Sequence, residues 1–425
     1  MNIIRWLTTP DTPATNRKNF LNVEIDAVGI GLANAAAPFL PVFLTRLGAS
    51  NFQVGLLTAM PAVTGFLLAI ALGNFLQRQR NIVPWFSAAR LLVVASYALT
   101  GLVTFFVPED MAVIAILAVW AIATIPQTVV AIGFSVVMNE VAGPTGRFDL
   151  MSRRWSIMGF TTAISVVIVG QVLDRIGFPV NYQAVFIALS IGGLISYYYS
   201  SHINIPDREV APRKAGLSLK QRIRDYTALI LKEKPFISFT AKRFVFLTGT
   251  TLATPLFPLY YVREVHANDA WIGIFSTAQT AVLIVGYFFW LRQSRLRGNR
   301  RVLIWATLGL SIYPAVVALT LNEPLIALFA GLSAVFQAGI DLVFFDELMK
   351  TVPPEYSAVF VSLAQSLQYL STVASPIIGT ALAGPLGIGG ALVVSAAIRF
   401  TGFLLFALEK PKAGEKEMAR LVEEN

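Results

Sequence analysis

The sequence predicts an all-α membrane protein of twelve transmembrane helices, built as two parallel six-helix repeats with both termini in the cytoplasm. Three observations lead to this fold class: the apolar composition, a succession of long apolar runs, and a stretch of sequence that occurs twice. Of 425 residues, 56% are hydrophobic and only 13% are charged, and the mean hydropathy is +0.66. Soluble domains carry about 25% charged residues, so this chain has too few charges to cover its apolar surface in water.

The long apolar runs define the expected membrane spans. Each is long enough to cross about 30 Å of hydrocarbon as a helix that rises about 1.5 Å per residue. They are continuous runs rather than the short alternating segments of a β-barrel, which favours helices. The twelve expected spans are 20–44, 52–76, 82–106, 111–138, 155–174, 182–201, 236–262, 270–291, 302–321, 324–349, 357–382 and 386–408.

The basic residues predict the orientation. With both termini inside, 26 of the 33 Lys and Arg residues fall in cytoplasmic segments, and only Arg46, Arg175 and Arg263 fall outside. Four more lie within the spans. Cytoplasmic loops of membrane proteins are enriched in Lys and Arg, so this asymmetry favours cytoplasmic termini over the opposite orientation.

Repeated stretches relate the two halves of the chain. In the first pair, both copies carry two prolines three residues apart, followed by an arginine. Because the matching stretches follow in the same order, the halves are parallel repeats. The pairs are "PFLPVFLTRLGASNFQVG" (38–55) with "PLFPLYYVREVHANDAWIG" (255–273), "LQRQRNIVPW" (76–85) with "LRGNRRVLIW" (296–305), and "NEV" (139–141) with "DEL" (346–348).

The repeats predict a division of the chain into three parts. An N-terminal bundle of six helices covers 1–201, and a C-terminal bundle with a short cytoplasmic tail covers 236–425. Between them, 202–235 forms a cytoplasmic linker. Within it, "LSLKQRIRDYTALILKEK" places apolar side chains on one helical face with Lys and Arg around the rest. This pattern predicts an amphipathic helix on the anionic inner leaflet.

This layout resembles that of the major facilitator superfamily, whose members have six plus six helices in parallel repeats. The family's loop between spans 2 and 3 usually reads G-x-L-x-D-R-x-G-R-[KR]. Here 73–81 reads "GNFLQRQRN", in which Gly73 and Arg78 match and Gln77 replaces the Asp; the copy "RLRGNRR" in the second half keeps Gly298. The resemblance implies two bundles around a central cavity that opens alternately to each side, with spans 1, 4, 7 and 10 lining it.

Seven ionisable residues lie inside the expected spans, roughly 6–15 Å from the cytoplasmic ends. Buried charges in a membrane are costly, so each is a functional candidate. We expect the acids to serve proton or substrate coupling and the bases to act as gate charges, or only to tie helices together or reach lipid headgroups. The acids are Glu24, Asp26 and Asp341, and the bases are Arg90, Lys242, Arg243 and Arg399.

Pairings among these charges follow from the family arrangement and from the repeat. Adjacent spans would let Arg90 meet Glu24 or Asp26, and Arg399 meet Asp341. The first repeated stretch has an offset of 217 residues, which sets Asp26 opposite Arg243. Equivalent positions in the two halves would then carry opposite charges near the cytoplasmic mouth of the cavity, where the two could pair when the mouth closes.

Two further groups of candidates are polar residues of the same helices. Residues near the cytoplasmic ends are predicted to form a gate, and neutral polar residues deeper in the spans are predicted to line the cavity, with interhelical hydrogen bonding as their alternative role. The gate candidates are Asn139, Glu140, Asp346, Glu347 and Arg78; the cavity candidates are Asn34, Gln127, Thr254, Gln279, Gln365 and Gln368.

The sequence also limits the source of energy. No lysine directly follows a glycine, so the phosphate-binding loop of nucleotide-driven pumps is missing. There are no cysteines and only two histidines, and we find no nucleophile–base constellation, so an enzyme is not expected. We therefore expect a multi-pass cell-membrane protein with no cofactor, driven by a proton or sodium gradient. Its partners would be the lipid bilayer and a small-molecule substrate, with no nucleic acid and no second subunit.

The leading functional hypothesis is proton-coupled export of small amphipathic compounds. The acids of span 1 resemble those of the multidrug/proton antiporters of the family. Span 5, however, reads "TTAISVVIVGQVLD" and lacks the proline of the G-P-x-x-G-G stretch that those exporters carry. The alternatives are proton- or sodium-coupled uptake of a nutrient, for which Lys242 and Arg243 would bind a carboxylate, and lipid transport or scrambling.

Overall fold

The computed structural model describes residues 14–77, 79–206, 233–351 and 357–409, and every regular element in these ranges is a helix. The predicted linker helix lies mostly in 207–232, outside the described residues. The helices are α2 (Ala14–Asn34), α3 (Phe39–Arg46), α4 (Asn51–Gln77), α5 (Val83–Phe106), α6 (Glu109–Arg175), α7 (Val180–Leu189), α8 (Ile191–Ser201), α10 (Lys234–Ala253), α11 (Leu256–Arg263), α12 (Asp269–Arg297), α13 (Asn299–Ala318), α14 (Glu323–Lys350) and α15 (Ser357–Ala407).

Within the described residues, 11 helical segments are long and apolar enough to cross a membrane. One of them, Ala364–Ala407, has 44 residues and covers the last two spans expected from the sequence. Gly387 interrupts it with φ of 73° and ψ of 165°. Glycine is the residue that adopts positive φ without steric cost, and this one lies beside the predicted boundary at 383–385. The membrane helices are confirmed, while the number twelve and the position of the termini stay predictions.

The first and seventh spans are each broken near a repeated proline. A turn at 35–38 separates α2 from α3, and a shorter turn at 254–255 separates α10 from α11. Pro38 and Pro255 directly precede the second helix of each pair. Proline lacks the N–H that would continue the hydrogen bonds of the preceding helix, so the repeated prolines explain why each span is built from two helices.

Helix α6 contains two expected spans and doubles back between them. The guanidinium carbon of Arg154 lies 4.7 Å from the centre of the Phe134 ring. Residues twenty positions apart in a straight helix would be about 30 Å apart. The chain therefore reverses direction between these residues, and the segments Asp110–Ala142 and Arg153–Arg175 are separate membrane spans.

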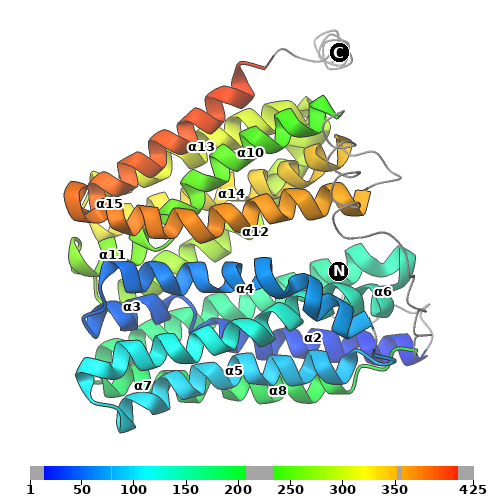
Figure 1. Cartoon of the computed structure of the whole chain (residues 1–425), viewed down its shortest axis with the longest axis horizontal. Helices are drawn as coiled ribbons and strands as arrows, with labels where there is room; N and C mark the ends of the chain where they lie inside the picture. The colour runs from blue at the N-terminus through cyan, green and yellow to red at the C-terminus, as the bar shows by residue number, and fades with distance from the viewer. Residues whose placement is uncertain (1–13, 78, 207–232, 352–356, 410–425) are drawn as a thin grey trace. The chain divides into compact units, whose positions relative to one another are not determined.

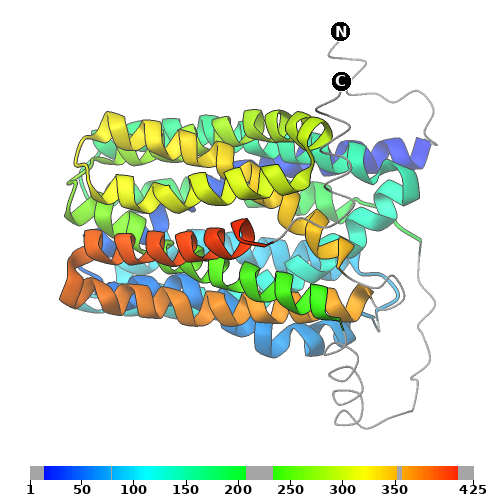
Figure 2. The same cartoon turned by 90° about the horizontal axis from the view of Figure 1, so that it is seen from above.

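The chain forms two compact units. Unit 1 comprises 1–49, 63–213 and 268–274, and unit 2 comprises 50–62, 214–267 and 275–425. In both views the long helices of each unit lie alongside one another (Figures 1 and 2). The division into bundles at 201 and 236 stays a prediction, because short segments of α4 and α12 cluster with the unit opposite to the rest of their helix.

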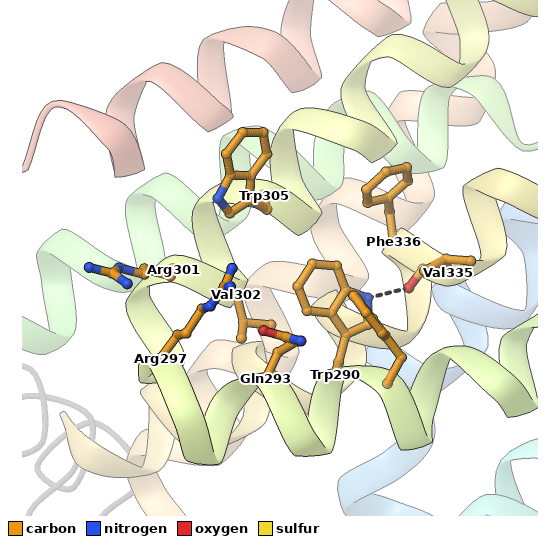
Figure 3. A pocket seen from close by; sticks show the side chains of 9 residues that line it. Trp290, Gln293, Arg297, Arg301, Val302, Trp305, Val335 and Phe336 are labelled. Carbon is orange, nitrogen blue, oxygen red and sulfur yellow. Dashed lines mark hydrogen bonds between the residues drawn. The ribbon is translucent and has the colours of Figure 1, made fainter. Parts of the chain in front are cut away.

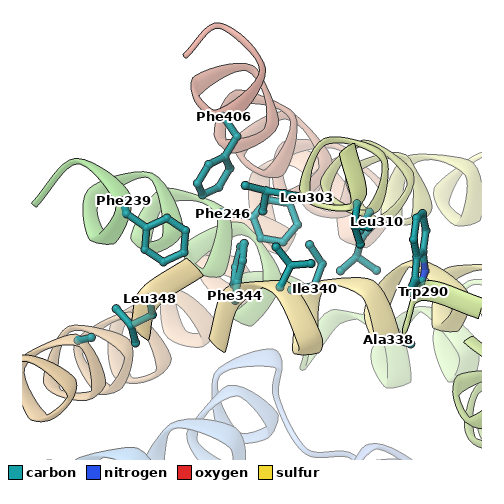
Figure 4. Packing of buried hydrophobic residues seen from close by; sticks show 14 of the residues in the cluster. Phe239, Phe246, Trp290, Leu303, Leu310, Ala338, Ile340, Phe344, Leu348 and Phe406 are labelled. Atoms are coloured by element: carbon teal, nitrogen blue, oxygen red, sulfur yellow. The ribbon is translucent and has the colours of Figure 1, made fainter. Parts of the chain in front are cut away.

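Each unit has its own apolar core. In unit 1, Phe86 is fully buried among Val23, Leu76 and Val137. In unit 2, aromatic side chains of α10, α14 and α15 meet, with Phe344 at the centre and Phe239, Phe246 and Phe406 around it (Figure 4). Edge-to-face contacts of this kind are favourable beyond the area they bury.

Both units contain a close crossing between their first and last helices. A Cβ added at Gly29 of α2 would lie 2.5 Å from the carbonyl oxygen of Gly192 in α8. A Cβ added at Gly249 of α10 would lie 3.0 Å from the carbonyl oxygen of Ser395 in α15. Small residues let membrane helices approach this closely. The two crossings are equivalent, so Gly29 aligns with Gly249, an offset of 249 − 29 = 220.

This alignment corrects the predicted equivalence of Asp26 and Arg243. The offset of 217 holds only after the helix break, where α3 and α11 begin at Phe39 and Leu256. Before the break the offset from the glycine crossings is 220, and the turn after α2, which is two residues longer than the turn after α10, accounts for most of this difference. Asp26 therefore corresponds to Phe246, and the two halves do not place opposite charges at these positions.

Candidate functional site

A buried ionic cluster centred on Asp26 is the most polar feature of unit 1. Arg90 of α5 donates to Oδ1 of Asp26, and Ser196 of α8 donates to the same oxygen at 2.6 Å. Arg154 of α6 approaches Oδ2 at 3.5 Å. The carboxylate is 0% exposed. Four helices thus converge on one acid, and the predicted pair between Arg90 and Asp26 is confirmed.

Glu24 lies on the same helix but has a different partner. Its Oε1 lies 3.8 Å from Nη1 of Arg153, and both side chains are buried. Residues two apart on a helix point in different directions, which is why the two acids meet different arginines. Sequence reasoning missed Arg153 and Arg154, because it counted "RR" as loop immediately before an apolar segment. The helix continues through them and carries both side chains inside.

A cavity of about 300 Å³ lies beside this cluster in unit 1. The guanidinium groups of Arg90 and Arg154 line one part of it, and aromatic side chains line another. Asn34, a predicted cavity residue, is also in its wall and donates to the sulfur of Met158 at 3.8 Å. The wall residues are Ile30, Ala33, Asn34, Arg90, Val93, Val94, Tyr97, Val130, Ala131, Phe134, Arg154, Trp155 and Met158.

In unit 2, Asp341 and Arg399 do not form the predicted pair. Asp341 accepts a hydrogen bond from the Tyr287 hydroxyl at 2.8 Å and another from the Gln337 amide at 2.7 Å. Arg399 is buried and donates to the carbonyl oxygens of Leu310 at 3.1 Å and Thr250 at 3.4 Å. The main-chain dipoles of two neighbouring helices thus take the place of the expected carboxylate.

The other two basic candidates of unit 2 also have partners within that unit. Arg243 donates to the side-chain oxygen of Gln368 at 2.8 Å and lies 5.8 Å from the ring centre of Phe344. Lys242 forms an ion pair of 2.8 Å with Glu409. Both oxygens of Asp26 face arginines of unit 1, and the pairing of Asp26 with Arg243 stays a prediction.

The predicted gate residues that are described form contacts within their own helix and with one neighbour. Lys350, at the end of α14, lies 2.8 Å from both Asp346 and Glu347. Burial opposes the charge of Lys350, but these two carboxylates raise its pKa above the ordinary value. Asn299, which follows the repeated Gly298, donates to Asp346. Glu140 is exposed, while Arg78 and the side chain of Asn139 lie outside the described residues.

The remaining polar candidates have mainly local roles. Gln279 donates to the hydroxyl of Tyr313 at 3.2 Å, which links α12 to α13. Thr254 donates to a carbonyl of its own chain four residues earlier. Gln127 is half-buried and Gln365 is exposed. None of these four residues lines the cavity of unit 1.

A polar cluster at the start of α12 was not predicted, although the repeat contained its signal. Asp269 accepts from Arg46 at 2.9 Å and from the hydroxyl of Tyr182 at 2.5 Å, all within unit 1. Within unit 2, Arg263 donates to Asn51 at the start of α4. The repeat aligns the two arginines, and it also aligns Asn51 with Asp269. Each arginine therefore holds the first turn of the helix that begins in the opposite half of the sequence.

A second cavity, of about 350 Å³, lies in unit 2 among α12, α13 and α14 (Figure 3). Trp290 forms its floor and donates to the carbonyl oxygen of Val335 at 2.6 Å. Arg297, Arg301 and Trp305 line it and are exposed. Exposed arginine beside tryptophan is typical of the membrane interface, so this cavity has the character of a lipid-headgroup contact.

Comparison with known proteins was made for both sequence and structure. The family model described as "Major Facilitator Superfamily" matches residues 242–422. No curated protein matches the sequence at a significant level. The structure is similar to solved structures of transporters, all of low sequence identity, so this likeness concerns the fold.

Three of these structures cover almost the whole chain. A bacterial homologue of the iron transporter ferroportin in an inward-facing state has a TM-score of 0.71 at 14% identity, covering 92% of this chain and 98% of that one. A D-xylose–proton symporter has a TM-score of 0.69 at 14% identity, with 94% and 98% covered. A point mutant of the nucleoside transporter NupG has a TM-score of 0.67 at 13% identity, with 92% and 99% covered. The C-terminal part of the chain is thus similar in sequence to the major facilitator superfamily, and the whole chain has the fold of these transporters.

Proposed function

We propose that the protein is a secondary active transporter that exports small amphipathic compounds in exchange for protons. The observation that carries this proposal is Asp341. Its carboxylate lies in a membrane span, and among the described residues its hydrogen bonds come from two neutral donors, Tyr287 and Gln337. An acid without a cationic partner in such a place can take up and release a proton without breaking an ion pair.

Asp26 is less suited to this role. Its charge is already compensated by Arg90 and Arg154. A proton arriving at Asp26 would have to displace these arginines and leave them buried without an anion, which is strongly unfavourable. We therefore assign proton coupling to Asp341 and a helix-organising role to Asp26, in place of the shared role expected from the sequence.

The Asp341 site also suggests how protonation acts on the helices. The ionised carboxylate accepts hydrogen bonds from α12, through Tyr287, and from its own helix, through Gln337. The protonated acid becomes a donor itself and no longer needs both. Protonation thus weakens the link between α12 and α14, and a change of this kind biases the equilibrium between conformations.

The proposed transport cycle is that of the major facilitator superfamily, which the chain resembles in its C-terminal sequence and in its fold. Alternating access by rocking of two bundles needs no nucleotide and no cofactor. We place the protein in the cell membrane as a monomer, with an ion gradient as its energy source. The proton is favoured over sodium because a single carboxylate with two neutral donors is a poor cation cage but a sufficient proton site.

The experiment that tests this proposal measures coupled fluxes in proteoliposomes with an imposed pH gradient. Compounds such as naphthalene-2-carboxylate and ethidium are offered, and a lumenal pH dye reports proton movement. The wild-type protein should move protons in the direction opposite to the compound. Asp341→Asn should abolish gradient-driven accumulation but keep counterflow, whereas Asp110→Asn, which changes an exposed acid, should behave as wild type.

Other outcomes of this experiment would contradict the proposal. Protons and compound moving in the same direction would indicate uptake, and gradient-independent flipping of labelled lipid would indicate scrambling. Wild-type accumulation by Asp341→Asn would refute the role of this acid.

The cluster at the start of α12 gives a second prediction. Asp269 is held by Arg46 within unit 1, whereas the rest of α12 beyond Ile274 belongs to unit 2. We expect alternating access to require the release of this first turn. The chain has no native cysteine, so Arg46→Cys and Asp269→Cys can be joined by a short bifunctional thiosulfonate reagent.

Cross-linking this double variant should stop transport, and reduction should restore it. Each single variant, treated with the same reagent, controls for loss of the ion pair itself. Full transport by the cross-linked protein would show that the cluster does not open during the cycle.

A further inference from the structure

The cluster around Asp26 carries more positive than negative charge. Arg90 and Arg154 both face Asp26, which is the only acid in ion-pair contact with either of them among the described residues. Arg153 does not change this balance, because it faces Glu24. The side chains of Arg90 and Arg154 are each 3% exposed. A surplus charge at this depth is expensive unless an anion accompanies it.

The two arginines also have more hydrogen-bond donors than their neighbours have acceptors. The Nε atoms of Arg90 and Arg154 are buried and have no hydrogen-bond partner in the described part of the chain. Arg154 reaches Asp26 at 3.5 Å, at the limit of a hydrogen bond, and Arg90 reaches Ser196 at 3.4 Å in addition to Asp26. A planar guanidinium group has donors enough for a second, bidentate acceptor. Arg90 and Arg154 are both lining residues of the cavity of about 300 Å³, so a bound anion would lie within reach of their guanidinium groups.

The rest of the cavity wall is apolar and aromatic. Phe134 and Trp155 lie next to the Arg154 guanidinium, at 4.7 Å and 5.7 Å from their ring centres. Tyr97 and Asn34 line the same space. A few convergent polar groups in a mainly apolar cavity are typical of a small-molecule site. This one has a cationic end and an aromatic end.

We propose that this cavity binds an amphipathic organic anion with a single negative charge. Its carboxylate or sulfonate would accept hydrogen bonds from Arg154 and Arg90, and its aromatic or apolar body would pack against Phe134 and Trp155. The ligand would carry a single charge because two arginines and one acid leave one positive charge to be balanced. Cationic amphiphiles are disfavoured because they would meet two guanidinium groups. This inference rests on the proposed transport function, for which it names the substrate class.

The competing explanation is that the rings alone stabilise the surplus charge. Arg90 lies 4.2 Å from the ring centre of Phe86, and Arg154 lies near two rings. Cation–π contacts stabilise a guanidinium group that is removed from water. Under that explanation the cavity holds only water, and anions bind no better than neutral compounds of the same shape.

The test is a binding measurement on the purified full-length chain in nanodiscs of neutral lipid. The probes are naphthalene-2-carboxylate, its neutral carboxamide, and naphthalen-2-ylmethylammonium, measured by calorimetry without any gradient. The carboxylate should bind about tenfold to a hundredfold more tightly than the carboxamide, as expected for a charge-assisted hydrogen bond. The ammonium should bind no better than the carboxamide.

Variants locate the site. Arg154→Gln should remove the preference for the carboxylate. Ala131→Phe, which narrows the cavity without touching the ionic cluster, should weaken all probes and covers the case in which Arg154→Gln fails to fold. Arg297→Gln is the matched control, because it changes an arginine beside tryptophan in the other cavity, and it should bind as wild type.

Three results would overturn the proposal. The first is equal affinity for carboxylate and carboxamide, and the second is loss of binding in Arg297→Gln. The third is displacement of the probe by phosphatidylglycerol in the nanodisc, which would make the anion a lipid headgroup rather than a substrate. Asp341→Asn should still bind the carboxylate, so failure of proton coupling and failure of this site are distinguishable.

Discussion

Replacing Asp26 with alanine should destabilise the protein by about 3–5 kcal/mol, the cost of leaving buried charges without their partner. Asp26 accepts from Arg90, Ser196 and Arg154, which lie on three other helix segments. Its removal leaves two guanidinium groups side by side in the interior of unit 1. They would repel each other, and α5 and α6 would separate from α2.

The loss is measured by unfolding in mixed detergent micelles, or by the fraction of folded protein that survives heating. Asp110→Ala, at an exposed acid, is the control and should stay within about 0.5 kcal/mol of wild type. The double variant Asp26→Ala/Arg90→Met should be more stable than Asp26→Ala alone, because it removes one of the unpaired charges. Independent effects of the two changes would show that the cluster does not hold the helices together.

The contrast between Asp26 and Asp341 shows which contacts can be predicted from the sequence and which cannot. Both were recognised from the sequence as costly acids in a membrane span. The order of spans in the family predicted that Arg90 meets Glu24 or Asp26, and of these two acids the structure shows Asp26 as its partner. The pairing of Arg399 with Asp341 followed from the same reasoning and is wrong, because α14 turns the acid toward Tyr287 and Gln337. Span order fixes which helices are neighbours, but not the rotation of each helix.

The boundaries of spans limited the prediction of the site. Arg153 and Arg154 adjoin an apolar run, and hydropathy alone cannot tell an interfacial pair from a buried one. The helix extends beyond the apolar run and carries both arginines inward. The repeat offset failed for a similar reason. Pro38 and Pro255 align correctly, but the offset upstream is 220 rather than 217, and the longer turn before Pro38 accounts for two of these three residues.

The fold was easier to predict than the site because it depends on many residues at once. Long apolar runs specify membrane helices whatever the exact side chains are. The repeated prolines then located the breaks between α2 and α3 and between α10 and α11. Contacts such as that of Asp269 with Arg46 depend on a single pair, and they become visible only when the repeat is read as two aligned arginines and their partners.

The second large effect is expected at the crossing of α2 and α8. A Cβ at Gly29 would lie 2.5 Å from the carbonyl oxygen of Gly192 and 2.7 Å from the amide nitrogen of Ser196. Both atoms belong to backbone, so no side chain can turn aside to make room. The helices must move apart, and overpacking of this kind costs about 1–3 kcal/mol.

In Gly29→Ala the damage should extend beyond the crossing itself. Asp26 lies about one turn before Gly29, and its hydrogen bond from Ser196 spans the same pair of helices. Separation of α2 and α8 stretches that bond, so the ionic cluster weakens together with the packing. Gly29→Ala should therefore lower both the thermal stability and the affinity for an anionic probe.

Gly73→Ala is the matched control, since it adds the same methyl group to a membrane helix where a Cβ meets nothing within 4 Å. It should be neutral or slightly stabilising, because alanine favours a helix more than glycine does. Equal stability of the two variants would mean that α2 and α8 do not cross at Gly29.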